Sequence, residues 1–460
     1  MDTATWLLLD TLLAVVGLVL LITWLKLNAF IALAIASLAA GIGAGMNVAT
    51  VADAFEAGVG DMLGKVAMVI GLGAVLGQML GESGGAKKLA ASMLDACGPR
   101  LLAVAVIGCA FLIGIPVFFT VGLVLLVPVL VPLAERAGIR LSRLGLPLVA
   151  GLSVSHALVP PHPGPMAAIG MLHADVGKTI LYSILIGVPT ALVAGLMFAR
   201  VDVGEATPAS DEKQNAGDQS LLARRAAGEM EPIRSPALAW VLLTILLPIL
   251  LMLLRTLAEL LLSGNARFEP LLHTAQMLGD PAVAMLIAVL VSFVTMGLSV
   301  GMSRRQIAAT SGASLAPIAE ILLVVAAGGG FSRVLIASGV GDAILHRATA
   351  VAISPLLLGW LATAAIRVAT GSATVAITTA AGLLAPLAAK SGVRPEMMVL
   401  AMGAGSIVCS HVNDGGFWLV QKYLRLNTPE TLRTWTVLET VISIVAFGLT
   451  LLLSAAVGPK

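Results

Sequence analysis

The chain has 460 residues, of which 58% are hydrophobic and 11% are charged, and its mean hydropathy is +1.02. An ordinary soluble domain carries about 25% charged residues, so this composition excludes a soluble globular enzyme, a disordered protein and a nucleic-acid binder. It predicts an all-α polytopic membrane protein, because a helix that spans a bilayer needs roughly 20 mostly apolar residues. The net charge of +2 indicates no particular partner.

The first half of the chain, residues 1–201, begins with apolar sequence and carries no basic segment before it. We therefore expect a first transmembrane helix rather than a cleaved signal peptide. The run 101–134 is too long for one crossing, so we predict a re-entrant helical hairpin there. The elements predicted in chain order are three scaffold helices within 5–83, the hairpin 101–134, a broken helix over 145–172 and a last helix over 179–200.

Residues 202–236 interrupt the apolar pattern with a run of polar and charged side chains, which predicts a cytoplasmic linker between two halves. The second half, 237–460, repeats the order of the first. Its predicted elements are scaffold helices within 237–338, a re-entrant hairpin over 350–389, a broken helix over 396–424 and a last helix over 436–457.

Short blocks of sequence recur between the halves at an offset of 254 or 255 residues. Thr120-Val121 recurs as Thr374-Val375, and Ser155-His156 as Ser410-His411. Internal repeats in a membrane protein are typical of secondary transporters. If each hairpin returns to its own side, each half crosses five times, and the repeats are inverted. With both termini in the periplasm, 17 Lys and Arg residues face the cytoplasm and 7 face outward, as the positive-inside rule requires.

The predicted hairpin tips lie at 116–122 and 370–374, and both combine glycine with hydroxyl residues. Such residues let a chain turn within the membrane and leave backbone groups free for a ligand. A packing face of small residues between helices is the alternative interpretation.

The prolines of segment 153–165 cannot continue a helix, so they predict a break within an apolar run. The N-terminus of the following half-helix carries partial positive charge and suits a carboxylate. His156 and His162 flank this break. The alternative is a kinked helix with two structural histidines.

Segment 409–418 places Asp414 beside two glycines in apolar surroundings, and an ionisable residue within a membrane is a functional candidate by default. His411, Asn413 and Asp414 are candidates for binding hydroxyl groups or relaying a proton. An interfacial loop is the alternative. Arg367 lies one turn before the second tip, where its planar guanidinium suits a carboxylate or else reaches the membrane surface.

No metal ion or cofactor is expected. The three cysteines are sparse and show no metal-ligand spacing, and the two histidines of the proline segment have no convincing third ligand.

Several segments resemble the gluconate permease family of bacterial sugar-acid transporters, which belongs to the ion transporter superfamily. The most specific are H-A-L-V-P-P-H-P-G-P at 156–165, R-V-A-T-G-S-A-T-V-A at 367–376 and S-H-V-N-D-G-G-F-W at 410–418. The resemblance implies proton symport of gluconate or a related small hydroxy acid across the bacterial inner membrane, by a protein that is often a homodimer. Family members often have Glu at the first tip where this chain has Thr120, which leaves the proton-coupling residue open.

We therefore expect a secondary active symporter for a small anionic substrate and a proton, and not an enzyme. The predicted substrate-binding residues are Phe119, Thr120, Gly122, Ser155, His156, His162, Gly164, Gly371, Ser372, Thr374, Asn413 and Arg367. The proton-coupling candidates are His156, His162, His411 and Asp414. The alternatives are a symporter for D-serine, glycerate or a ketodeoxy sugar acid with different ion coupling, an anion channel, and an intramembrane hydrolase built on His156 and a nearby serine.

Overall fold

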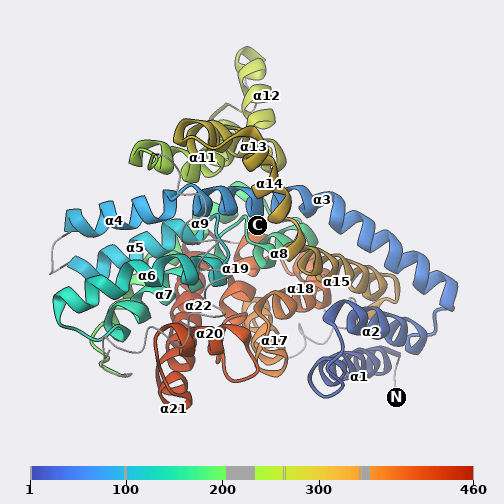
Figure 1. The fold of residues 1–460 in the computed structure, drawn as a ribbon. Helices are drawn as coiled ribbons and strands as arrows, with labels where there is room; N and C mark the ends of the chain where they lie inside the picture. Colours follow the sequence, from blue (N-terminus) through green and yellow to red (C-terminus); the bar gives the residue numbers. More distant parts are fainter. Residues whose placement is uncertain are drawn as a thin grey trace.

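A computed structural model of the protein describes residues 3–97, 101–203, 234–262, 264, 266–340, 343 and 353–458. Within these ranges every regular element is a helix, and nine helical segments are long and apolar enough to cross a membrane (Figure 1). The predicted all-helical membrane fold is confirmed. The inverted relation of the two halves and the domain limits stay predictions, and residues 204–233 of the predicted linker lie outside the described residues.

Two of the N-terminal helices pack against a helix from the second half. The N-terminal elements are α1 (Thr3–Thr23), α2 (Ala29–Gly43), α3 (Val48–Glu82) and α4 (Gly85–Cys97), and the helix from the second half is α15 (Ala319–Ala337). Helices α2 and α3 pack against α15, while α1 packs against α2 and α4 packs against α5 (Leu102–Gly114). A side chain at Gly58 of α3 would run into the backbone of Gly329 and Gly330 of α15. Small residues thus bring α3 and α15 into close contact, as is common between membrane helices.

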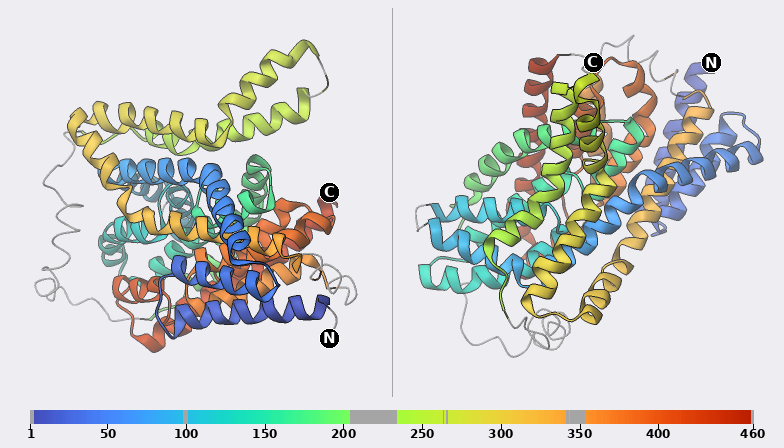
Figure 2. Two further views of the ribbon diagram at one scale, coloured as in Figure 1. Left: turned by 90° about the vertical axis from the view of Figure 1, so that its right-hand side faces the viewer. Right: turned by 90° about the horizontal axis from the view of Figure 1, so that it is seen from above.

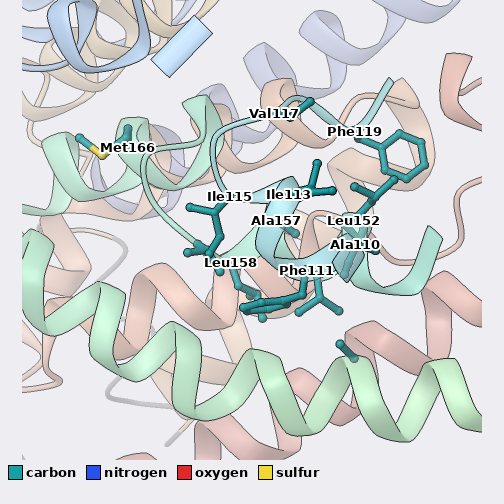
Figure 3. Close-up of a cluster of buried hydrophobic side chains, with 14 of the residues drawn as sticks. Ala110, Phe111, Ile113, Ile115, Val117, Phe119, Leu152, Ala157, Leu158 and Met166 are labelled. Atoms are coloured by element: carbon teal, nitrogen blue, oxygen red, sulfur yellow. The ribbon is translucent and has the colours of Figure 1, made fainter. Parts of the chain in front are cut away.

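A hairpin and a broken helix follow. Their elements are α5 (Leu102–Gly114), α6 (Phe119–Ala137), α7 (Ser142–Leu158), α8 (Pro163–Leu172) and α9 (Val176–Phe198). The prolines end α7 and restart the chain as α8, whose first residue is Pro163, a position where a missing amide proton costs no helical bond. Figure 3 shows apolar side chains of α5, α7 and the connection 115–118 packed into one cluster, which includes Ile113, Val117 and Leu152.

The next elements are α11 (Leu238–Leu262), α12 (Glu269–Leu278), α13 (Pro281–Ser292) and α14 (Arg304–Ala313). Of these, α11, α12 and α13 form one edge of the molecule, at the top of Figure 1 and along the upper side of the left view of Figure 2, and α14 leads from this edge toward α15. Within α11 an ion pair joins two residues one turn apart, since Arg255 Nε lies 3.0 Å from Glu259 Oε1.

The C-terminal part repeats the order of hairpin, broken helix and last helix. Its elements are α17 (Pro355–Thr370), α18 (Ala373–Lys390), α19 (Pro395–Gly405), α20 (Gly415–Tyr423), α21 (Thr428–Thr431) and α22 (Val437–Val457). Residues 406–414, between α19 and α20, have no helical structure. The segment α19–α20 is therefore a broken helix, like the segment α7–α8.

Candidate functional site

A cavity of about 490 Å³ lies where the two hairpin connections and the second helix break meet. Its walls come from both halves of the chain: polar side chains of α6, α7, α17, α18, α22 and the loop before α20, and apolar side chains of α6 and the segment 317–321. The polar and charged lining residues are Thr120, Ser153, His156, Arg367, Thr370, Ser372, Thr374, Asn413, Asp414 and Glu439.

The first hairpin connection contributes the start of α6 to the cavity. Phe118 is the residue before α6, and no side-chain hydrogen bond from this position caps the first amides of the helix in the described part of the chain. Phe119 and Thr120 of that turn line the cavity. A side chain at Gly77 of α3 would run into the Pro116 carbonyl, so this glycine lets the connection pack closely against α3.

The second connection depends on a glycine in the left-handed conformation. Gly371 has φ of +75°, and a side chain there would also meet the Asn413 backbone carbonyl. The Ser372 side chain then caps α18 by accepting a bond from the Val375 amide at 3.3 Å. A residue larger than glycine at 371 would therefore separate the second hairpin from the loop before α20.

Three helices begin at this cavity. The first residues of α6 (Phe119), of α18 (Ala373) and of α20 (Gly415) all belong to its lining. The N-terminus of a helix carries about half a positive charge and presents unbonded amide donors. Ser372 caps the end of α18 and Asp414 caps the end of α20, whereas the end of α6 has no side-chain cap among the described residues. The α6 end therefore offers amide donors to an anionic ligand.

A partly buried ion pair joins the second hairpin to the start of α20. Arg367 Nη2 lies 2.5 Å from Asp414 Oδ2, and the Arg367 side chain is 4% exposed. Arg367 also donates to the Gly371 carbonyl, and Ser410 donates to Asp414. Trp435 Nε1 donates to Ser410 Oγ at 2.8 Å. Arg367 Nε is buried and has no hydrogen-bond partner among the described residues, so the guanidinium keeps a donor beyond this network.

The two histidines of the proline segment are adjacent but differ in access to the cavity. Their ring centroids lie 4.9 Å apart. His156 lines the cavity, and its buried Nδ1 has no partner in the described ranges. His162 lies behind it, with Nε2 2.5 Å from the Gly114 carbonyl oxygen.

The structure brings together most, but not all, of the residues that the sequence predicts for the site. Gly122, Ser155, His162, Gly164 and His411 lie outside the cavity lining. Ser155 Oγ bonds to backbone carbonyls of its own helix, at 3.1 Å for Gly151 and 3.0 Å for Leu152. His411 Nε2 lies 3.1 Å from the Val368 carbonyl oxygen. The predicted roles of these five residues stay predictions.

The predicted substrate-binding and proton-coupling sets omitted four residues of the lining that carry a polar group: Ser153, Thr370, Trp435 and Glu439. Thr370 nevertheless lies in the predicted tip 370–374. Glu439 carried a usable signal, because it lies inside the predicted span 436–457, and a carboxyl group within a span is a functional candidate by default. Ser153 and Trp435 carried none, since nothing in their local sequence tells which side of the helix meets the cavity.

Among the described residues, no group of three or more His, Cys, Asp or Glu side chains is placed to hold a metal ion.

The sequence matches the model of the GntP family permease over residues 6–456. The chain belongs to this family. The predicted family is thereby confirmed, and so is the prediction of a transporter rather than an enzyme.

Two relatives match this permease over almost their full length. This chain is 43% identical to the gluconate permease of Pseudomonas aeruginosa, over 98% of both chains. It is 40% identical to the high-affinity gluconate transporter of Escherichia coli, over 94% of this chain and 95% of that protein. Family membership and the nine apolar helical segments of the described ranges support a multi-pass protein of the inner membrane.

A solved structure supports the fold. The YdaH transporter of Alcanivorax borkumensis superposes on this permease with a TM-score of 0.60, at 20% identity and over 88% of each chain. At this level of identity the likeness concerns the fold alone.

Proposed function

We propose that this permease takes up gluconate, or a closely related small sugar acid, together with a proton. The observation that carries the proposal is the cavity where three helix N-termini meet the buried Arg367. The helix N-termini supply partial positive charge, and Arg367, although paired with Asp414, keeps its Nε without a partner among the described residues. The gluconate permease of P. aeruginosa and the high-affinity gluconate transporter of E. coli supply the substrate class.

In this proposal the substrate carboxylate accepts hydrogen bonds from the first amides of α6 or α18 and from Arg367. The hydroxyl groups of the sugar acid bond to Thr120, Ser372, Thr374, Asn413 and His156, which line the same cavity. A volume of about 490 Å³ accommodates a small ligand together with a few water molecules.

Transport requires the cavity to open to each side in turn. We propose that the two hairpins and the two broken helices move together against the remaining helices, in a homodimer whose termini face the periplasm. Inverted repeats around a central site are a common basis for such alternating access.

A ligand screen on the purified protein tests the substrate class. Gluconate should raise the melting temperature by mass action, whereas gluconamide, which keeps the hydroxyl groups but has no charge, should not. Equal stabilisation by the two compounds would contradict a site built for a carboxylate. Stabilisation by glycerate or D-serine but not by gluconate would replace gluconate with that substrate.

A further inference from the structure

A second buried carboxyl group faces the cavity from α22. The Glu439 side chain is 1% exposed and lines the same space as Thr120 and Arg367. Its Oε1 atom has no hydrogen-bond partner among the residues that the structure describes. An ionisable group at such a position within a membrane protein is costly and needs an explanation.

The start of α22 is held firmly against the loop 406–414. Trp435 Nε1 donates to Ser410 Oγ at 2.8 Å, and Thr436 Oγ1 donates to the Ser410 carbonyl at 2.5 Å. The Cys409 amide donates to Thr440 Oγ1 at 3.2 Å. Residues 432–436 form a π-helical turn, a feature that is frequent at functional sites. These bonds flank Glu439 on both sides and fix its direction toward the cavity.

The groups facing Glu439 come from three other elements. Ser153 and His156 belong to α7, Arg367 to α17, and Asp414 precedes α20. All four of these side chains line the same cavity as Glu439. Arg367 is already paired with Asp414, and the Glu439 carboxyl group lines the same cavity.

This arrangement couples the charge of Glu439 to the charge of a ligand. The Arg367–Asp414 pair is neutral as a unit, so an ionised Glu439 leaves the buried site with one negative charge. An anionic sugar acid would add a second negative charge in a space where uncompensated charge is expensive. Protonation of Glu439 removes one of these charges, and the anion and the proton therefore favour each other's binding.

We propose that Glu439 carries the proton that is transported with the substrate. The carboxylate takes a proton from water on the outer side, remains neutral while the sugar-acid anion is bound, and returns the proton to water on the inner side. This inference rests on the proposed function, and it assigns the coupling to a residue other than the four candidates from the sequence.

The test compares two modes of transport in proteoliposomes that contain the variant Glu439→Gln. Glutamine keeps the shape and stays neutral, so the variant should still exchange labelled for unlabelled gluconate, at a reduced rate. It should not accumulate gluconate in response to a pH gradient. In the wild type a gradient of about one pH unit, equivalent to about 1.4 kcal/mol, should drive about tenfold accumulation.

Glu396→Gln is the matched control, because Glu396 is also buried but lies outside the cavity lining and accepts a bond from the Asp175 amide at 3.1 Å. It should accumulate gluconate like the wild type. Glu439→Asp retains a titratable group and should accumulate gluconate with an altered pH profile, which provides a second test if Glu439→Gln does not fold.

Accumulation by Glu439→Gln to the wild-type level would overturn the assignment, as would a folded Glu439→Gln that neither exchanges nor accumulates. A Glu439→Asp variant with an unaltered pH profile would also count against it. If the wild type and Glu396→Gln both moved no gluconate in either mode, the proposed function itself would fail.

Discussion

Arg367 and Asp414 are 47 residues apart in the sequence, and their side chains meet at 2.5 Å between Nη2 and Oδ2. The contact ties the end of α17 to the start of α20, which are elements of the second hairpin and the second broken helix. Both residues line the cavity, so the ion pair is part of the site as well as of the scaffold.

The Arg367→Lys variant should weaken gluconate binding by at least about tenfold, or about 1.4 kcal/mol. Lysine keeps the positive charge but cannot reproduce the planar fork that serves Asp414 and the Gly371 carbonyl together. Calorimetric titration with gluconate measures the change. The control is Arg255→Lys, whose Glu259 pair lies outside the cavity lining and is partly exposed. A loss of affinity in the control equal to that in Arg367→Lys would contradict a role for Arg367 in the site.

The Gly371→Ala variant should lose both thermal stability and gluconate uptake. The left-handed φ alone costs about 1–2 kcal/mol for a residue with a side chain. The Asn413 backbone carbonyl adds a steric clash at this position. Gly392→Ala is the matched control, since Gly392 has φ of +68° but has no atom within 4 Å of the added carbon among the described residues. Equal melting temperatures for the two variants would show that the close contact between Gly371 and Asn413 does not contribute to thermal stability.

The Gly77→Ala variant should displace the first hairpin connection and reduce transport. Its methyl group would enter the space of the Pro116 carbonyl, and backbone atoms cannot yield as a flexible side chain can. Gly64→Ala, in the same helix, meets no described atom within 4 Å and should be neutral or stabilising by up to about 1 kcal/mol. Unfolding curves together with uptake rates measure both effects. Full activity of Gly77→Ala would indicate that the connection does not depend on α3.

The Thr120→Val variant should raise the KM for gluconate about five- to tenfold, the effect of losing one hydrogen bond worth about 1 kcal/mol. Valine preserves the shape of the side chain, so the melting temperature should change little. Thr379→Val removes a buried hydroxyl group that has no partner in the described ranges and lies outside the cavity lining, and it should leave KM unchanged. Equal KM values for all three proteins would exclude Thr120 from substrate recognition.

Local sequence was sufficient to predict the all-helical membrane fold and the break between α7 and α8, but it did not predict the shorter helices α4, α12 and α14. The prolines at 160, 161 and 163 end α7 whatever packs around it, because they cannot continue a helix. The glycine at 371 marks the turn between α17 and α18. The recurrence of Thr120 as Thr374 pointed to both hairpin connections, and both threonines line the cavity. In these cases the short-range stereochemistry of the chain decided the outcome.

The composition of the cavity depended instead on which face of each helix turned inward. Ser155 and Ser153 lie two residues apart on α7, yet the predicted Ser155 bonds to its own helix while Ser153 lines the cavity. Glu439 comes from a helix 286 residues beyond Ser153, and no local pattern relates the two. Contacts between such distant residues arise only from tertiary packing.

The most direct test of the account is accumulation of labelled gluconate in proteoliposomes under an inward proton gradient, with sodium equal on both sides. The account predicts saturable accumulation above the external concentration, which a protonophore abolishes. Accumulation that ignores the proton gradient but follows a sodium gradient would contradict proton coupling. A flux that never saturates and never exceeds equilibrium would contradict a transporter and indicate a channel.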